Sequence, residues 1–247
     1  MRNKHVKIIS ENAIIKYDFF EKVFLTYFKK TKYYNKIKNR INWYYQQCLK
    51  IIFLETHKKY LNLIWDADTL IINKIELTGI EKVIFTSSTS VYGNQAETIT
   101  EESELLGTTE AARQIIAVEK KLLEHKQFES CILRLGGLVG PNRHPIFTLS
   151  GKKNIPNPLS PINFIHQQDA VSIILHIIEN WQGNQAYNAV TPFHPTRIDY
   201  YSEMAKIAAL EAPAFEKSGI VRGIVSANKV RKDLNFKFLV KNLLILN

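Results

Sequence analysis

Two short runs of apolar residues, each ending in polar residues, constrain the fold of this chain more than any other feature of its sequence. Residues 82–87 and 130–135 have the length and the apolar centre of strands that are buried on both faces of a sheet. Between them, residues 109–125 carry apolar side chains at helical spacing, with Thr108 or Thr109 as a helix cap. A strand, a helix and a strand in succession predict two parallel neighbours in an α/β sheet.

The same alternation continues toward the C-terminus. Helical spacing recurs at residues 167–180 and 197–210, and a short strand at residues 186–190 separates these two helices. A last helix is expected at residues 227–234, with Ser226 as its cap. The C-terminal part of the chain therefore extends the predicted sheet and its helical cover.

Glycine, proline and asparagine mark the connections between these elements. The run Gly-Gly-Leu-Val-Gly-Pro at residues 136–141 is expected to form a turn, and residues 141–161 a loop. Asp169, near the start of the helix at 167–180, is expected to cap that helix.

The region before residue 82 fits the sheet less well. Residues 68–73 predict a further buried strand, but only the eight residues 74–81 separate it from the strand at 82–87. A parallel crossover usually needs about a dozen residues or more. Either these two strands are not parallel neighbours, or a helix has been lost and the N-terminal half of the sheet is incomplete.

The positive charge of the chain is confined to its first 60 residues. The formal net charge is +10, and residues 1–60 hold 14 Lys and Arg against four Asp and Glu, which leaves 19 of each sign in the remainder. Bases interleaved with aromatic residues can follow phosphates and stack on nucleobases. Lys, Asn, Ile, Tyr and Phe are also the residues of A/T-rich codons, as in a displaced reading frame. We favour the second interpretation and expect no nucleic-acid partner.

Composition excludes several other classes. Cys48 and Cys131 are too few and too far apart for a disulfide framework or a thiolate metal site, so a reducing cytoplasm is expected. The seven histidines show no pair at ligand spacing, and no metal is predicted. No apolar stretch approaches the roughly 20 residues of a membrane span, and no membrane partner is expected.

Four motifs in order resemble one family. They are the strand and turn at residues 85–93 (Phe-Thr-Ser-Ser-Thr-Ser-Val-Tyr-Gly), residues 133–143 (Leu-Arg-Leu-Gly-Gly-Leu-Val-Gly-Pro-Asn-Arg), residues 163–169 (Asn-Phe-Ile-His-Gln-Gln-Asp) and residues 187–189 (Tyr-Asn-Ala). Together they resemble the extended and atypical short-chain dehydrogenase/reductases, the NAD-dependent epimerase/dehydratase group. The resemblance covers about residues 66–240. It implies a Rossmann-like parallel sheet with a small C-terminal substrate lobe.

The resemblance also implies a ligand site. The family acts on nucleotide sugars or related small molecules with NAD or NADP. Ser88 matches the family's catalytic serine, and a hydroxyl at the carboxyl end of a parallel strand faces the crevice where ligands bind. Tyr92, Arg143, His144 and His166 are the residues that the resemblance places near the substrate.

The family's proton relay is not matched. A tyrosine and a lysine four residues apart precede a glutamate that Glu119 matches, which puts Ala111 and Ile115 at the two positions. Neither side chain can carry a proton. The resemblance therefore implies the family's binding function, while the residues do not support its usual catalysis.

The cofactor site is incomplete as well. The family holds the pyrophosphate at a glycine-rich turn before a helix, whereas no glycine precedes Gly79 here. The residues that the resemblance leaves for cofactor binding are strand ends, namely Ile72, Asn73, Thr86, Ser87, Gly136 and Gly137. Binding of NAD or NADP is expected to be impaired.

The sequence thus predicts two parts, a basic and aromatic-rich segment at residues 1–60 and a Rossmann-like domain at residues 61–247. Three functions remain open: an epimerase/dehydratase-like protein with weakened or absent catalysis, a non-catalytic dinucleotide-sensing or interaction module, and nucleic-acid binding through residues 1–60. A truncated or degenerate family member would explain the missing glycines. The substrate, the choice between NAD and NADP and the oligomeric state stay undetermined.

Overall fold

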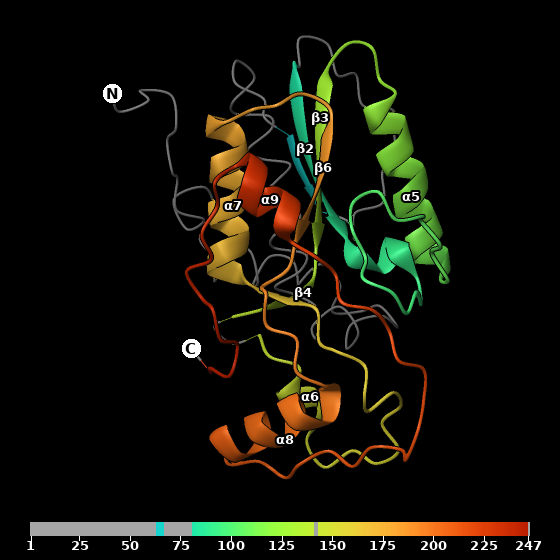
Figure 1. The fold of residues 1–247 in the computed structure, drawn as a ribbon, viewed down its shortest axis with the longest axis vertical. Helices are drawn as coiled ribbons and strands as arrows, with labels where there is room; N and C mark the ends of the chain where they lie inside the picture. The colour runs from blue at the N-terminus through green and yellow to red at the C-terminus, as the bar shows by residue number, and fades with distance from the viewer. Residues whose placement is uncertain (1–62, 67–80, 141–142, 247) are drawn as a thin grey trace, which may run out of the picture. The chain divides into compact units, whose positions relative to one another are not determined.

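Four parallel strands form the centre of the structure, a computed structural model that describes residues 63–66, 81–140 and 143–246 (Figure 1). In sheet order they are β1 (Leu63–Asp66), β2 (Lys82–Ser88), β3 (Glu129–Leu135) and β6 (Gln185–Ala189). The basic segment at residues 1–60, the strand predicted at 68–73 and the two cofactor candidates within it, Ile72 and Asn73, lie outside the described residues.

The predicted pairing of the two buried runs is confirmed. β2 and β3 are parallel, with Ile84 opposite Cys131 and Phe85 opposite Ile132. β3 pairs with β6 in the same direction. The predicted α/β class with a parallel sheet is therefore correct.

The strand beside β2 is β1, upstream of the strand that the sequence predicted. β1 and β2 are parallel, with Leu63 opposite Val83. The connection runs over residues 67–81, fifteen residues, which is long enough for a parallel crossover. The short connection inferred from the sequence therefore does not apply to this pair of strands.

Helices cover both faces of the sheet, because successive side chains of a buried strand point to opposite faces. Phe85 and Ile132 pack toward α5 (Glu110–Leu123), while Ile84 belongs to the apolar cluster on the opposite face of the sheet. That cluster includes α7 (Gln167–Glu179) and α9 (Asn228–Asp233). Figure 1 shows α5 on one side of the sheet and α7 with α9 on the other.

Helix α5 begins where its sequence predicts. The Thr109 side chain accepts a hydrogen bond from the amide of Ala112 at 3.1 Å, and so satisfies one of the free N–H groups of the first turn. Glu110 in the first turn and Lys120 and Lys121 in the last turn complement the helix dipole.

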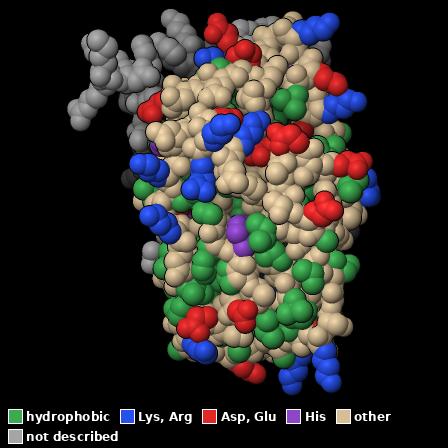
Figure 2. Space-filling model, in the orientation of Figure 1, with side chains coloured by type: hydrophobic (Ala, Val, Ile, Leu, Met, Phe, Trp, Pro, Cys, Tyr) green, Lys and Arg blue, Asp and Glu red, His purple; other side chains and the backbone are tan. Residues whose placement is uncertain are grey.

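A smaller lobe adjoins the carboxyl ends of the strands. It contains α6 (Ile146–Leu149) and α8 (Arg197–Ile207), and it is joined to the sheet through the parallel pair β4 (Gly137–Val139) and β5 (Phe164–His166). In Figure 1, α6 and α8 lie together below the sheet, and on the face in Figure 2 apolar side chains gather over this lower part. The prediction of a turn at residues 136–141 was wrong, since Gly137–Val139 form strand β4.

The start of α7 also differs from the prediction. Its N-cap is His166, whose Nδ1 accepts the amide of Gln168 at 3.2 Å. Asp169 is 0% exposed, and its carboxylate accepts the amides of Leu239 at 2.8 Å and Val240 at 3.1 Å. Asp169 therefore fastens the C-terminal segment to α7, and the prediction that it caps the helix was wrong.

All described residues belong to one compact unit. In the described ranges, no helix combines the length and the apolar character that crossing a bilayer requires.

We expect Asp169→Ala to lower the free energy of unfolding by about 2–4 kcal/mol, because the amides of Leu239 and Val240 lose a charged acceptor that holds the C-terminal segment on α7. Urea denaturation followed by circular dichroism measures this change. The matched control is Glu179→Ala at the other end of α7, an exposed carboxylate whose removal is expected to cost less than about 0.5 kcal/mol. Equal losses in the two variants would contradict the assignment.

Candidate functional site

A cavity of about 390 Å³ opens where β2 ends. Ser88 and the turn that follows it line the cavity, as do Arg197 and Tyr201 of α8. Segments 157–164 and 222–225 supply the remaining lining. The carboxyl end of a parallel strand is where α/β proteins usually bind ligands.

Ser88 is both the last residue of β2 and the N-cap of the short 3₁₀ helix η1 (Thr89–Tyr92). Its Oγ accepts a hydrogen bond from the amide of Ser90 at 3.2 Å, so the Ser88 side chain caps the turn. Ser88 also lines the cavity, and its hydroxyl hydrogen remains available to a ligand.

A strap formed by residues 220–225 crosses one side of the cavity. Asn157 Oδ1 accepts the Ile220 amide at 2.8 Å, and Ser160 Oγ donates to the Ile220 carbonyl at 2.7 Å. Asn163 donates to the Gly223 carbonyl at 3.0 Å and accepts the Val225 amide at 3.0 Å. These three polar side chains line the cavity but already have backbone partners.

Several polar groups of the lining have no hydrogen-bond partner among the described residues, and two of them belong to the strap and to α8. The guanidinium of the exposed Arg222 and the hydroxyl of the buried Tyr201 form no hydrogen bond with any described residue. Burial raises the pKa of Tyr201 to about 12, so its phenol stays protonated near neutral pH and can donate a hydrogen bond. Arg197 is held by the carbonyl of Pro156 at 2.7 Å.

The cavity is electropositive. Among the described residues that line it, Arg197 and Arg222 are cations, and there is no aspartate or glutamate. Two cations in one lining without a described carboxylate favour an anionic ligand.

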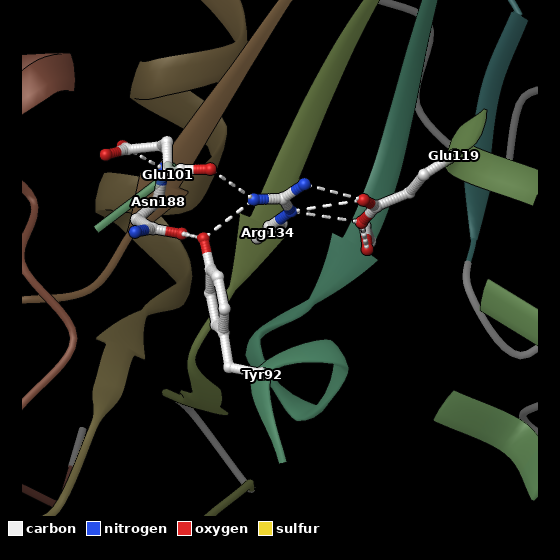
Figure 3. A network of polar contacts seen from close by, with 6 residues as sticks. Tyr92, Glu101, Glu119, Arg134 and Asn188 are labelled. Atoms are coloured by element: carbon white, nitrogen blue, oxygen red, sulfur yellow. Dashed lines mark hydrogen bonds and ion pairs between the residues drawn. The ribbon is translucent and has the colours of Figure 1, made fainter. Parts of the chain in front are cut away.

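Behind the cavity wall lies a buried polar network centred on Arg134 of β3 (Figure 3). Arg134 Nη2 lies 2.8 Å from Glu119 Oε2, and its Nε donates to both carboxylate oxygens of Glu119. Ser87 donates to the same carboxylate from β2. Burial alone would lower the pKa of Arg134, but the hydrogen bonds and charge of Glu119 raise it, so the guanidinium stays charged.

The network continues toward β6. Arg134 Nη1 donates to the Tyr92 hydroxyl at 2.8 Å, which in turn donates to Asn188 Oδ1 at 2.7 Å. Arg134 Nη1 also lies 3.2 Å from the carbonyl oxygen of Glu101, whose carboxylate accepts the Asn188 amide at 2.7 Å. Burial raises the pKa of both Tyr92 and Glu101.

The two positions that the resemblance assigns to the family's proton relay lie on α5. Ala111 is exposed and Ile115 is buried against the sheet. Ile115 packs with Phe85 and Ile132 in the apolar core, so its position serves packing.

The predicted cofactor residues within the described ranges have local structural partners. The Ser87 hydroxyl is bonded to Glu119, and Thr86 lies in mid-ladder opposite Leu133. A Cβ at Gly136 would lie 2.5 Å from the Asn163 carbonyl oxygen, and one at Gly137 would lie 2.4 Å from the Phe164 ring. Close packing of β4 on β5 therefore requires glycine at both positions, whatever their role toward a cofactor.

Ser88, the predicted catalytic residue, lines the cavity, but the four predicted substrate residues do not. Tyr92 is enclosed in the Arg134 network. His144 is buried, its Nε2 2.8 Å from the Tyr200 hydroxyl, and burial lowers its pKa. Arg143 is exposed and pairs through its backbone with Gly140, and His166 is the buried N-cap of α7. Substrate contact by these four residues stays a prediction.

The sequence did not single out the cavity residues of the smaller lobe. Arg197 and Arg222 resemble any surface arginine, and Tyr201 follows another tyrosine in an ordinary helical pattern. The only local signal was that the loop at residues 141–161 is rich in proline and asparagine, whereas residues 220–225 are mostly apolar. Their common position depends on packing between distant segments.

Only part of a dinucleotide site falls in the described ranges. The place for a pyrophosphate turn lies outside them, and Ile115 stands at the position that the resemblance gives to the family's lysine. Ser87 and Gly136 are engaged as described above, so the described residues do not by themselves form a cradle for the cofactor. No cluster of three or more metal-ligand side chains occurs in the described part.

We expect Arg134→Met to cost about 3–5 kcal/mol of unfolding free energy, because it leaves the Glu119 carboxylate buried without a cation. The double variant with Glu119→Leu is expected to recover part of this loss, since no charge is then stranded. Chemical denaturation measures both. Arg113→Met is the control, because its pair with Glu110 is exposed at 58% and 70% and contributes less than about 1 kcal/mol. A double variant less stable than Arg134→Met would contradict this account.

The chain is similar to one curated protein of E. coli. No family model matches this chain. Over 161 residues it is 34% identical to Protein YeeZ of Escherichia coli strain K12, which covers 64% of this chain and 58% of YeeZ. The chain therefore spans less than two thirds of the length of that relative.

Solved structures share the fold. MoeE5 in complex with UDP-glucuronic acid and NAD matches with a TM-score of 0.58 and 18% identity, over 81% of this chain and 67% of that chain. dTDP-glucose 4,6-dehydratase of Bacillus anthracis in complex with NAD matches with a TM-score of 0.57 and 17% identity, over 79% and 64%. The described part of the chain therefore has the fold of the extended short-chain dehydrogenase/reductases, the NAD-dependent epimerase/dehydratase group that its sequence resembles.

Proposed function

We propose that this protein is an epimerase/dehydratase-like protein that binds an anionic small molecule, a nucleotide sugar or a related compound, in the cavity at the end of β2. The charge of the cavity carries the proposal, because two arginines and no described carboxylate line a space next to Ser88. Phosphate or sugar carboxylate groups fit such a lining, and Arg222 has its guanidinium free to pair with them.

The size and polarity of the cavity support the same class. About 390 Å³ lies within the range of small-molecule sites. Ser88 and Tyr201 offer hydroxyl donors, while Ile99 and Phe164 offer apolar surface for a sugar or base ring. MoeE5, which shares the fold, is described with UDP-glucuronic acid and NAD, which makes these two compounds suitable probes.

We place binding, and not turnover through the family's tyrosine and lysine, at the centre of the function. Ala111 and Ile115 cannot exchange a proton, and the raised pKa of Tyr201 keeps its phenol protonated near neutral pH. NAD or NADP would supply hydride chemistry when bound. The described residues position the ligand: Ser88 orients a hydroxyl or carbonyl, and Arg222 neutralises an anionic group.

The other proposals rest on the sequence. The division into residues 1–60 and 61–247 and a reducing cytoplasm as the compartment remain proposals. Nucleic-acid binding through residues 1–60 falls outside the described residues, and retention on heparin by a variant lacking them would argue against it.

We expect Arg222→Ala to weaken binding of UDP-glucuronic acid about 10-fold, because a charged pair in a partly shielded cavity is lost. Isothermal titration calorimetry measures the dissociation constant. Arg231→Ala is the matched control, an exposed arginine on α9 outside the cavity lining, and it is expected to leave the constant unchanged. The proposal fails if the unmodified protein does not bind the probe, or if both variants weaken binding equally.

We expect no turnover of UDP-glucuronic acid or UDP-glucose with NAD or NADP, because the proton relay positions hold Ala111 and Ile115. Nicotinamide absorbance and chromatography of the sugar nucleotide follow the reaction. Ser88→Ala separates the two cases: it is expected to weaken ligand binding with no rate to lose. A measurable rate that Ser88→Ala abolishes would show that a catalytic site exists.

A further inference from the structure

Three polar residues form a single row across the apolar sheet. In the strand register, Ser87 of β2 lies opposite Arg134 of β3, and Arg134 lies opposite Asn188 of β6. All three are buried, with exposed fractions of 3%, 4% and 0%. Because facing residues in a ladder share a face of the sheet, the row forms one polar line below the cavity end of the strands.

The next residue of β2 points the other way. Successive side chains of a strand alternate between faces, so Ser87 is directed to Glu119 on α5 and Ser88 away from it, into the cavity lining. Fixing the Ser87 side chain therefore fixes the direction of Ser88.

Arg134 holds the turn after β2 at both ends. Before the turn, its guanidinium binds the carboxylate of Glu119 to which Ser87 donates. After the turn, Nη1 donates to the Tyr92 hydroxyl at 2.8 Å, and the guanidinium carbon lies 5.1 Å from the centre of the Tyr92 ring. Figure 3 shows Arg134 between these two partners.

The turn between these anchors forms one wall of the cavity. Ser88, Thr89 and Ser90 all line it, and they lie between Ser87 and Tyr92 in the chain. The turn closes through Gly93, whose amide donates to the Ser90 carbonyl at 3.2 Å and whose φ of +69° suits glycine.

We propose that Arg134 is a positioning residue for the ligand cavity: acting through Glu119–Ser87 on one side and Tyr92–Asn188 on the other, it sets the geometry of the Ser88 turn. This inference rests on the proposed binding function. A guanidinium is required because it donates from Nε, Nη1 and Nη2 in fixed directions, whereas a lysine ammonium cannot span both partners.

The test compares Tyr92→Phe and Arg134→Lys with Ile177→Val, a core variant on the opposite side of the sheet that serves as the control for general destabilisation. Tyr92→Phe keeps the ring, the Arg134–Glu119 pair and the contact of Arg134 with Glu101, and removes only the hydroxyl that bonds to Arg134 and Asn188. Amide hydrogen exchange at Ser90 and Gly93 reports the turn, since both amides are bonded within it.

We expect exchange at Ser90 and Gly93 to rise about 10-fold in Tyr92→Phe and more in Arg134→Lys, and to stay near the unmodified value in Ile177→Val, whose substitution lies in α7 on the other side of the sheet. The dissociation constant for UDP-glucuronic acid is expected to rise about 10-fold in Tyr92→Phe and to stay at the unmodified value in Ile177→Val.

Equal exchange at the turn in Tyr92→Phe and Ile177→Val would overturn the proposal, as would faster exchange with unchanged affinity. If Arg134→Lys does not fold, Tyr92→Phe alone decides. Failure of the unmodified protein to bind the probe is a failure of the proposed function, and the exchange experiment then still shows whether Arg134 sets the turn.

Discussion

The parallel pairing of β2 with β3 is the constraint on which the other features depend. Because both strands run in the same direction, their carboxyl ends meet at one edge, where Ser88 begins η1 and Gly136 leads into β4. Gly136 and Gly137 then allow β4 to approach β5 closely enough for backbone and ring contact. The cavity lies at this edge, because each parallel strand ends there and the segments that follow the strands line it.

Within this apolar sheet, the burial of one charged pair has a large cost that hydrogen bonds offset. Glu119 is 1% exposed, and it is stabilised by bonds from Arg134 and Ser87. Such a pair contributes little net stability compared with apolar packing, but it makes alternative arrangements unfavourable, because each leaves a charge or donor unmet. The network thus selects one relative placement of α5, β2, β3 and β6, and with it one turn geometry at Ser88.

Local pattern predicted those elements whose residues decide their own conformation. The apolar runs of β2 and β3, the helical spacing of α5 and its Thr109 cap were correct because strand burial and capping depend on near neighbours. Residues 136–141 were read as a turn from their glycines, yet those glycines permit close strand packing. Asp169 looked like a cap, but its carboxylate serves amides 70 and 71 residues away.

Only the part of the candidate site that lies at a strand end could be predicted from the sequence. Ser88 follows from the rule that carboxyl ends of parallel strands face ligands, whereas Arg222 and Tyr201 reach the cavity through the strap and α8, whose placement depends on long-range contacts. The strap also determines which groups can recognise a ligand. Asn157, Ser160 and Asn163 are occupied by its backbone, so selectivity falls to the few groups left free. A polar lining of this kind is therefore more selective than its composition suggests.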